Sequence, residues 1–486
     1  MNAIAMSARR IAGALALAAA PLLAQGAKFD RNAIPAPAPT PTTRIPTWTK
    51  ARLANGAELI VSVKKDLPLV SFNVGFIGGS TSYEPRDKTG VASFTAQMLS
   101  EGTTTKSADA FSNAQQVLGI NISANVTQET GVLGFTALKD RLPAAVELLT
   151  DMMLHPLLPA EALERIRGRA LVSIAQGRDN PNVVANNVFA KTTYGDEHPY
   201  GAFLTEASVK SITRDDIVAF HKAYFTPGHA VITVAGDVDP AAVKAMLDKA
   251  FAAWPAGGAK PDFKYPVAPE HKARTIYLVD KPKAAQSVFA LGHTGPDRYT
   301  PDYYALEVMN TILGGLFQSR LNHDIREEKG YSYGVGSSFS YGRGPGEFRA
   351  GGGIITAKSD SALILFMQHL RGAQGSEPFT DDELKQGKDA LVQSLPQQFS
   401  SVNGVRSAIS GIYLRDLPER YYQEYAAKVN AVTKEDLARV AKKYLDIDKM
   451  NLVIVGDRAA IEEALRKTGI APVVRLDVDG RPVITP

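Results

Sequence analysis

The chain has 486 residues, more than one ordinary domain holds, and this length favours two to four domains. Hydrophobic residues make up 45% and charged residues 21% of the sequence, as is typical of globular proteins with sizeable cores. The formal net charge of +4 comes without a dense cluster of Lys and Arg, which argues against a nucleic-acid partner, and the absence of Cys excludes thiol catalysis, disulfide bonds and a lipoprotein anchor.

The first 26 residues have the pattern of a secretory signal peptide. Arg9 and Arg10 precede an apolar run over residues 11–24, and small residues follow around Ala24 and Gly26. Because this run is shorter than the roughly 20 residues of a membrane-spanning helix, a cleaved signal peptide over 1–26 is favoured over an uncleaved anchor. We therefore expect an exported, periplasmic protein whose mature chain has no integral membrane segment.

Two Pro-rich stretches divide the rest of the chain. Residues 34–47 are rich in Pro and belong to an extended tether over 27–47. Residues 254–269 are rich in Pro and Gly and mark a linker over 257–272. These boundaries predict an N-terminal domain over 48–256 and a C-terminal domain over 273–486.

The same order of strands and helices is predicted in both halves. In the N-terminal half, alternating and helical hydrophobic periods predict a strand, a helix, a β-rich stretch and a helix over 67–77, 89–99, 121–138 and 144–153. In the C-terminal half the corresponding segments are 287–292, 303–313, 333–339 and 361–370. This order predicts an α+β fold in which helices cover one face of a largely antiparallel sheet in each half.

A repeat at a constant offset supports tandem duplication. Residues 212–237 and 432–457 share a Thr helix cap, an amphipathic helix and a β-rich run that ends in Gly-Asp. Four identical pairs lie 220 positions apart: Thr213 and Thr433, Asp216 and Asp436, Tyr224 and Tyr444, and Gly236 and Gly456. We interpret the chain as two homologous domains of about 220 residues.

The usual catalytic fingerprints are missing from the sequence. It contains no Gly-x-Ser-x-Gly, no P-loop and no dinucleotide-binding motif after a strand. A helical zinc site needs two His four apart, and no two of the eight His have this spacing or a spacing of three. Each His is therefore predicted to be a surface residue or a hydrogen-bonded structural residue, with a composite metal site from distant His as the alternative.

Several segments resemble the pitrilysin/insulinase-like zinc metallopeptidase family, in particular its processing-peptidase-like branch. The matching segments are TKARLANGAELIV (49–61), GGSTSYEPRDKTG (78–90), HPYG (198–201), AFHKAYFTP (219–227), VAGDVD (234–239) and, most specifically, NTILGGLFQSRLNHDIREEKGYSYGV (310–335). The resemblance runs from about residue 48 to 460. It implies two peptidase-like domains arranged as a clam-shell.

The resemblance also implies that the zinc site of the family is lost. Family members carry an inverted His-x-x-Glu-His motif on a helix and a Glu ligand further along. These positions fall on Ser93, Ala96, Gln97 and Ser173 of this chain, so three ligands and the general base are replaced. We expect no metal in this chain and no hydrolysis by it alone.

The C-terminal half keeps a second feature of the family. Arg326 and Tyr333 stand seven apart, and an Arg and a Tyr with this spacing bind substrate and stabilise the oxyanion in family members. The resemblance implies a non-catalytic, substrate-binding subunit of a peptide-degrading zinc metallopeptidase. Arg326 and Tyr333 would act in trans in a heterodimer or higher assembly, on a peptide held as an added β-strand, while zinc sits in a homologous partner subunit.

Two other functions stay open at this stage. The chain could be a catalytically inactive structural or peptide-binding protein of the same fold. It could also be an independent enzyme with an unrelated metal site, which would require metal bound at unit stoichiometry by the isolated chain.

Overall fold

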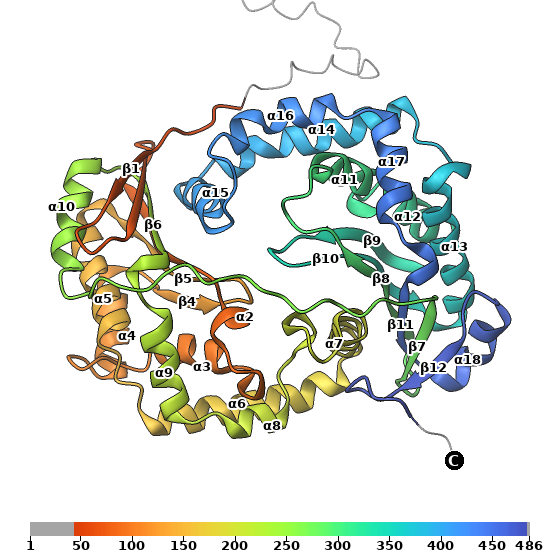
Figure 1. Ribbon diagram of the computed structural model, residues 1–486, viewed down its shortest axis with the longest axis horizontal. Helices are drawn as coiled ribbons and strands as arrows, with labels where there is room; N and C mark the ends of the chain where they lie inside the picture. Colours follow the sequence, from red (N-terminus) through yellow and green to blue (C-terminus); the bar gives the residue numbers. More distant parts are fainter. Residues whose placement is uncertain (1–42, 484–486) are drawn as a thin grey trace, which may run out of the picture. The chain divides into compact units, whose positions relative to one another are not determined.

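The computed structural model describes residues 43–483 and builds them around two six-stranded sheets. The predicted signal peptide over 1–26, and the predicted tether up to residue 42, lie outside the described residues. Each sheet is covered by helices, which confirms the predicted α+β class (Figure 1).

The first sheet has the strand order β1-β2-β6-β3-β5-β4. Its strands are β1 (Thr49–Arg52), β2 (Glu58–Val63), β3 (Leu69–Ile77), β4 (Ser123–Val126), β5 (Thr130–Leu138) and β6 (Ala230–Gly236). Only the β2–β6 pair is parallel, and the other four pairs are antiparallel. The sheet is therefore largely antiparallel, as predicted.

The second sheet has the order β12-β7-β11-β8-β10-β9. Its strands are β7 (Thr275–Asp280), β8 (Gln286–Gly295), β9 (Ser332–Ser340), β10 (Gly346–Ile355), β11 (Asn451–Gly456) and β12 (Val473–Leu476). The parallel β7–β11 pair and the antiparallel β11–β8–β10–β9 run repeat the β2–β6 and β6–β3–β5–β4 arrangement of the first sheet. This shared topology confirms the duplication inferred from the repeat.

Helices occupy equivalent places in the two halves. The first half contains α2 (Ser80–Tyr83), α3 (Val91–Met98), α4 (Ala108–Leu118), α5 (Leu142–Leu154), α6 (Ala160–Asp179), α7 (Pro181–Tyr194), α8 (Glu206–Ser211), α9 (Arg214–Tyr224) and α10 (Pro240–Ala250). The second half contains α11 (Tyr303–Asn310), α12 (Arg320–Asn322), α13 (Ser359–Arg371), α14 (Asp381–Gln398), α15 (Val402–Leu414), α16 (Tyr421–Ala431), α17 (Lys434–Tyr444) and α18 (Arg458–Lys467), with π-helical turns η6 (Thr311–Gly315), η7 (His323–Glu328) and η9 (Gly372–Ser376).

The repeated Thr residues begin the equivalent helices α9 and α17. Thr213 accepts a hydrogen bond from the backbone N–H of Asp216, and the Asp216 carboxylate accepts one from the backbone N–H of Thr213. Thr433 and Asp436 form the same reciprocal pair at α17. This capping box satisfies N–H groups that a helix start otherwise leaves unpaired, so the repeated letters have a local structural reason.

The two halves exchange one helix each, which the sequence did not reveal. Helix α7 of the first half packs on β8 and β11 of the second sheet, and α15 of the second half packs on β3 and β6 of the first (Figure 1). Helices thus cover both faces of each sheet, whereas the sequence predicted helices on one face only. Strands β3 and β6 are buried over almost their whole length, as two-sided cover requires.

The two exchanged helices make chemically different contacts. Helix α7 packs through apolar side chains that include Val188 and Phe189. Helix α15 adds polar contacts: Asn73 Nδ2 donates to Ser410 Oγ at 3.1 Å in a buried bond, and Ser71 Oγ donates to Asn403 Oδ1 at 2.6 Å. Neither half can bury its own sheet completely without the helix of the other.

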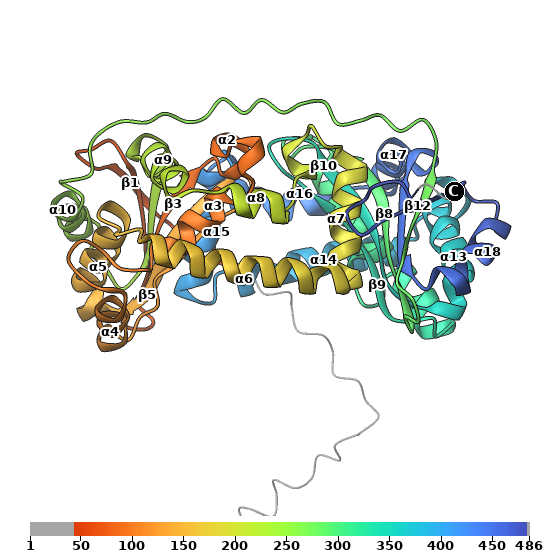
Figure 2. The same cartoon turned by 90° about the horizontal axis from the view of Figure 1, so that it is seen from below.

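A long segment without helix or strand joins the halves between α10 and β7 (Figure 2). Its backbone is held where Gly228 N donates to Gly257 O at 2.8 Å. Over residues 43–483, no helix is both long enough and apolar enough to cross a membrane.

Candidate functional site

Helix α3 carries three of the four positions that correspond to the zinc site. The helix begins after Gly90, whose φ of 112° is in the left-handed region. The Glu84 carboxylate accepts hydrogen bonds from Gly90 N at 2.7 Å and Ala92 N at 2.9 Å and so satisfies the free N–H groups of the helix start. The frame of an active-site helix is therefore in place.

The side chains on that frame cannot hold zinc. Ser93, Ala96 and Gln97 share one helix face through their i, i+3 and i+4 spacing. Ser93 Oγ donates to Gly90 O at 3.0 Å, Gln97 Nε2 donates to Ser93 O at 3.3 Å, and Ala96 is 4% exposed. Both polar groups bond to the backbone of their own helix, and none of the three is an imidazole or a carboxylate.

The fourth position, Ser173, lies exposed on α6, which packs against α3. Its hydroxyl replaces a carboxylate ligand, so no anionic donor comes from this helix position. Among residues 43–483, no group of three or more His, Cys, Asp or Glu is placed to hold a metal ion.

The eight histidines have structural or surface positions, as predicted. Five make hydrogen bonds with protein groups while largely buried: His198, His221, His229, His293 and His369. His271 bonds to Asn451 at 3.2 Å, and His155 and His323 are exposed. Burial lowers the pKa of His229 to about 4, which keeps this ring neutral.

Arg326 and Tyr333 flank the turn at Gly330, which leads from η7 into β9. Arg326 belongs to the π-helical turn η7, and Tyr333 is the second residue of β9. The Arg326 guanidinium stacks over the Phe317 ring at 4.4 Å from its centroid, and Arg326 Nε pairs with Glu327 Oε1 at 3.0 Å. Tyr333 is 87% exposed, so its phenol is open to a ligand or to another chain.

A buried amide connects the segments that carry these two residues. Asn322, which is 3% exposed, donates from Nδ2 to Phe317 O at 2.7 Å and accepts at Oδ1 from Val335 N at 3.0 Å. One side chain thus fixes the loop of Phe317, which supports Arg326, to the strand of Tyr333. Because backbone groups of both segments depend on this buried amide, Asn322 is a positioning residue for the pair.

Other contacts hold the segment of Phe317 and Asn322 against α13 and α14 of the same half. Arg320 forms a two-pronged pair with Glu383 at 2.6 and 2.7 Å, and Asp324 pairs with His369 at 2.8 Å. At Gly314 an added Cβ would lie 2.3 Å from Ser337 N, so only Gly allows η6 to approach β9 this closely. Sequence reasoning missed Phe317 and Asn322, although an aromatic residue two positions after Gly-Gly and an Asn beside an apolar Leu were visible signals.

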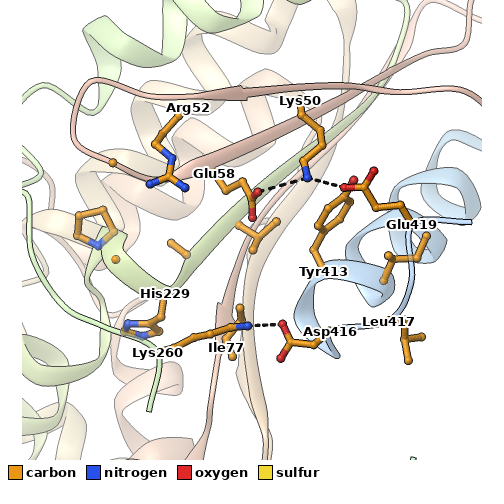
Figure 3. A pocket seen from close by; sticks show the side chains of 16 residues that line it. Lys50, Arg52, Glu58, Ile77, His229, Lys260, Tyr413, Asp416, Leu417 and Glu419 are labelled. Carbon is orange, nitrogen blue, oxygen red and sulfur yellow. Dashed lines mark hydrogen bonds and ion pairs between the residues drawn. The ribbon is translucent and has the colours of Figure 1, made fainter. Parts of the chain in front are cut away.

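A cavity of about 440 Å³ lies elsewhere, between β1, β2 and the loop after α15 (Figure 3). Its charges are mostly paired: Lys50 bonds to Glu419 and lies 3.8 Å from Glu58, and Lys260 pairs with Asp416. His229 at its edge is neutral. Because most of its charges are paired, we interpret this cavity as a contact region between β1, β2 and the loop after α15 and not as a catalytic centre.

Comparisons with known proteins agree with this geometry. Residues 60–203 match the model of Insulinase (Peptidase family M16), and residues 211–391 match the model of the Peptidase M16 inactive domain. A crystal structure of a peptidase M16 inactive domain from Pseudomonas fluorescens has a TM-score of 0.78 and 27% identity and covers 84% of this chain and 98% of that chain.

Two curated relatives match most of the chain. The uncharacterized zinc protease YmxG of Bacillus subtilis is 26% identical over 395 residues, which is 81% of this chain and 95% of the relative. The non-peptidase homolog YmxG of Helicobacter pylori is 20% identical over 393 residues, which is 81% of this chain and 90% of the relative. The first name implies a zinc enzyme and the second a protein without peptidase activity.

Proposed function

Because the chain belongs to the insulinase-like family of peptidases (peptidase family M16), we propose that it is the non-catalytic, substrate-binding subunit of an exported, heteromeric zinc metallopeptidase that degrades peptides. The observation that carries the proposal is a contrast between the two halves: Ser93, Ala96 and Gln97 offer no metal ligand, whereas Arg326 is stacked on a ring and Tyr333 is exposed.

The chemistry proposed for the pair is electrostatic. A guanidinium held over Phe317 presents N–H donors to a substrate carbonyl, and an exposed phenol can donate to the oxygen on which negative charge develops. Each such donor contributes about 3 kcal/mol to transition-state stabilisation. Zinc and its bound water are supplied by a homologous partner subunit, because this chain lacks the residues that would hold them.

The mode of substrate binding is strand addition. Strand β4 is one edge of the first sheet and β9 is one edge of the second, and each pairs with a strand on one side only. An unpaired edge offers backbone N–H and C=O groups to an extended peptide. On β9, Val335 N and Ser337 O already bond to Asn322 and Asn310, so the peptide is proposed to add at the start of the strand, where it passes Tyr333.

The test is reconstitution with a homologous chain that keeps His-x-x-Glu-His. We expect the two chains to co-purify and to cleave an unfolded peptide together. Combining Arg326→Ala with Tyr333→Phe should lower kcat/KM by roughly 10²-fold or more while assembly persists. Lys329→Ala, in the same turn, is the matched control and should have little effect. Full activity of the double variant would refute the role in trans.

The second candidate function is a structural or peptide-binding protein without any catalytic role. It is favoured by the hydrogen bonds of Ser93 and Gln97, whose side chains bond to the backbone of their own helix and need no ligand or metal. The discriminating result is an assembly that binds peptide but whose cleavage rate does not depend on this chain.

Export is part of the proposal and has its own test. Arg9, Arg10 and the apolar run after them support a signal peptide over 1–26. We expect the mature protein in the periplasmic fraction, beginning near residue 27 when its N-terminus is sequenced. Recovery of the full-length chain in the cytoplasm would contradict export.

A further inference from the structure

A second cavity, of about 600 Å³, lies where the β8–α11 loop faces α16 and α17. It contains none of Ser93, Arg326 or Tyr333, so it is separate from the site considered above. Its walls are largely aromatic and apolar, with Tyr304, Leu417, Pro418 and Tyr421 among them.

One cation in this cavity has no ion-pair partner. The Arg298 Cζ lies 3.5 Å from the centroid of the Tyr303 ring and 5.2 Å from that of Tyr421, so the guanidinium is held between aromatic faces. Its loop is fixed where Arg298 N donates to Gly342 O at 2.9 Å. Among residues 43–483, no carboxylate lies within 4.0 Å of this guanidinium.

The acidic residues around the cavity are already neutralised. Asp302 is bound by Arg439 at 2.6 Å and by Lys443 at 2.9 Å. Asp416 pairs with Arg343 and with Lys260, on the side of the other cavity (Figure 3). An anion entering beside Arg298 therefore meets little opposing charge from them.

Two further acidic residues lie near Arg298 or in the cavity wall: Glu307 and Asp436. Burial raises the pKa of Glu307, which interacts with the Arg298 charge from beyond ion-pair distance. Asp436 caps α17 and contacts Arg439. Neither carboxylate contacts the guanidinium, which keeps its N–H groups available.

We propose that this cavity binds a carboxylate carried on an apolar or aromatic body, such as the C-terminal residue of a peptide. Arg298 offers a planar donor fork that matches a carboxylate in a two-pronged pair. The stacked tyrosine holds that fork in place before binding, and the apolar wall accepts the side chain. Binding at this cavity is separate from the proposed function and needs no partner subunit.

The experiment is calorimetric titration of the full mature chain with N-acetyl-Leu-Phe and with its C-terminal amide. We expect the free acid to bind and the amide to bind at least tenfold more weakly, because only the acid supplies an anion for Arg298. This comparison uses the unaltered protein and does not depend on the folding of any variant. Equal binding of acid and amide, or no binding of the acid at millimolar concentration, would overturn the proposal.

Variants and a competing anion then locate the site. Arg298→Gln should weaken acid binding at least tenfold, whereas Arg420→Gln, an exposed cation paired with Glu424 outside the cavity, should leave it unchanged. Wild-type affinity in a folded Arg298→Gln protein would place the acid elsewhere and overturn the proposal. Inorganic phosphate should not displace the acid at equal concentration, and displacement would overturn the requirement for an apolar body.

Discussion

The two halves of the molecule share the order of five strands but differ in the segment that comes after the central antiparallel strand. After β3, helix α3 presents Ser93, Ala96 and Gln97, which offer no ionised or metal-binding group. After β8, the segment through η7 presents Arg326 and leads to the exposed Tyr333. The same backbone plan thus supports an inert face in one half and a cation with a phenol in the other. Fold and chemistry are therefore separable, because activity resides in side chains placed on a retained scaffold.

The largest effect is expected from rebuilding the inert face. The combination of Ser93→His, Ala96→Glu, Gln97→His and Ser173→Glu restores the family pattern on α3 and α6, and we expect one zinc ion per chain by elemental analysis. The matched control carries only Ser93→His and Gln97→His and should bind zinc at least about 10–100-fold more weakly, because it lacks a direct ligand and even outer-shell changes cost that much. Absence of zinc from the fourfold variant would show that α3 and α6 no longer keep the geometry of a metal site.

The exchanged helices provide a second comparison between the halves. Phe189→Ala on α7 removes a fully buried ring from the apolar contact and should lower the free energy of unfolding by about 3–5 kcal/mol. Ser410→Ala on α15 leaves Asn73 Nδ2 unpaired and should cost about 1–3 kcal/mol.

Urea unfolding measures both changes, with Val183→Ala on the more exposed side of α7 as the control near zero. A larger loss of unfolding free energy in Ser410→Ala than in Phe189→Ala would contradict the expectation that the apolar contact of α7 contributes more stability than the polar contact of α15.

Asn322 tests how the active segment of the second half is held. Asn322→Leu leaves Phe317 O and Val335 N without their buried partner and should lower the free energy of unfolding by about 2–4 kcal/mol. His323→Ala, the next and exposed residue, should change it by less than about 0.5 kcal/mol. Hydrogen exchange should rise first at β9, and unchanged protection there would show that Asn322 does not position this strand.

Between pH 7 and pH 5, acid should weaken the first half more than the second, because three of the four His whose pKa burial lowers lie there: His198, His221 and His229, against His293. Well above pH 6.5, the ordinary pKa of His, His229 is neutral in both the folded and the unfolded chain and contributes no pH dependence. As the pH falls toward 4, the unfolded chain takes up a proton that the folded chain refuses, so stability is lost.

For His229 this loss amounts to about 2 kcal/mol at pH 5. His229→Phe should therefore lose less stability between pH 7 and pH 5 than the wild type, as followed by urea unfolding at each pH. The exposed His323→Ala is the control and should keep the wild-type slope. An unchanged slope in His229→Phe would mean that the ring is protonated in the folded chain.

Local patterns in the sequence predicted more of the fold than of the site. The repeat of Thr213 and Thr433 reflects a cap that forms within four residues, and the strand at 69–77 follows from its own hydrophobic run. The exchange of α7 and α15 depends on contacts between the two halves of the chain, such as that of Asn73 with Ser410, 337 positions apart, which no local period records. The support of Arg326 by Phe317 and the isolation of Arg298 are likewise properties of three-dimensional neighbours.

The most direct test of the account is a titration of a zinc-bearing homologous subunit with this chain while peptide cleavage is measured. The account predicts no cleavage by this chain alone, a rate that rises to a plateau at one chain per partner, and a plateau lowered by roughly 10²-fold or more when the added chain carries Arg326→Ala and Tyr333→Phe. Zinc-dependent cleavage by this chain alone, or a plateau that does not depend on Arg326 and Tyr333, would contradict it.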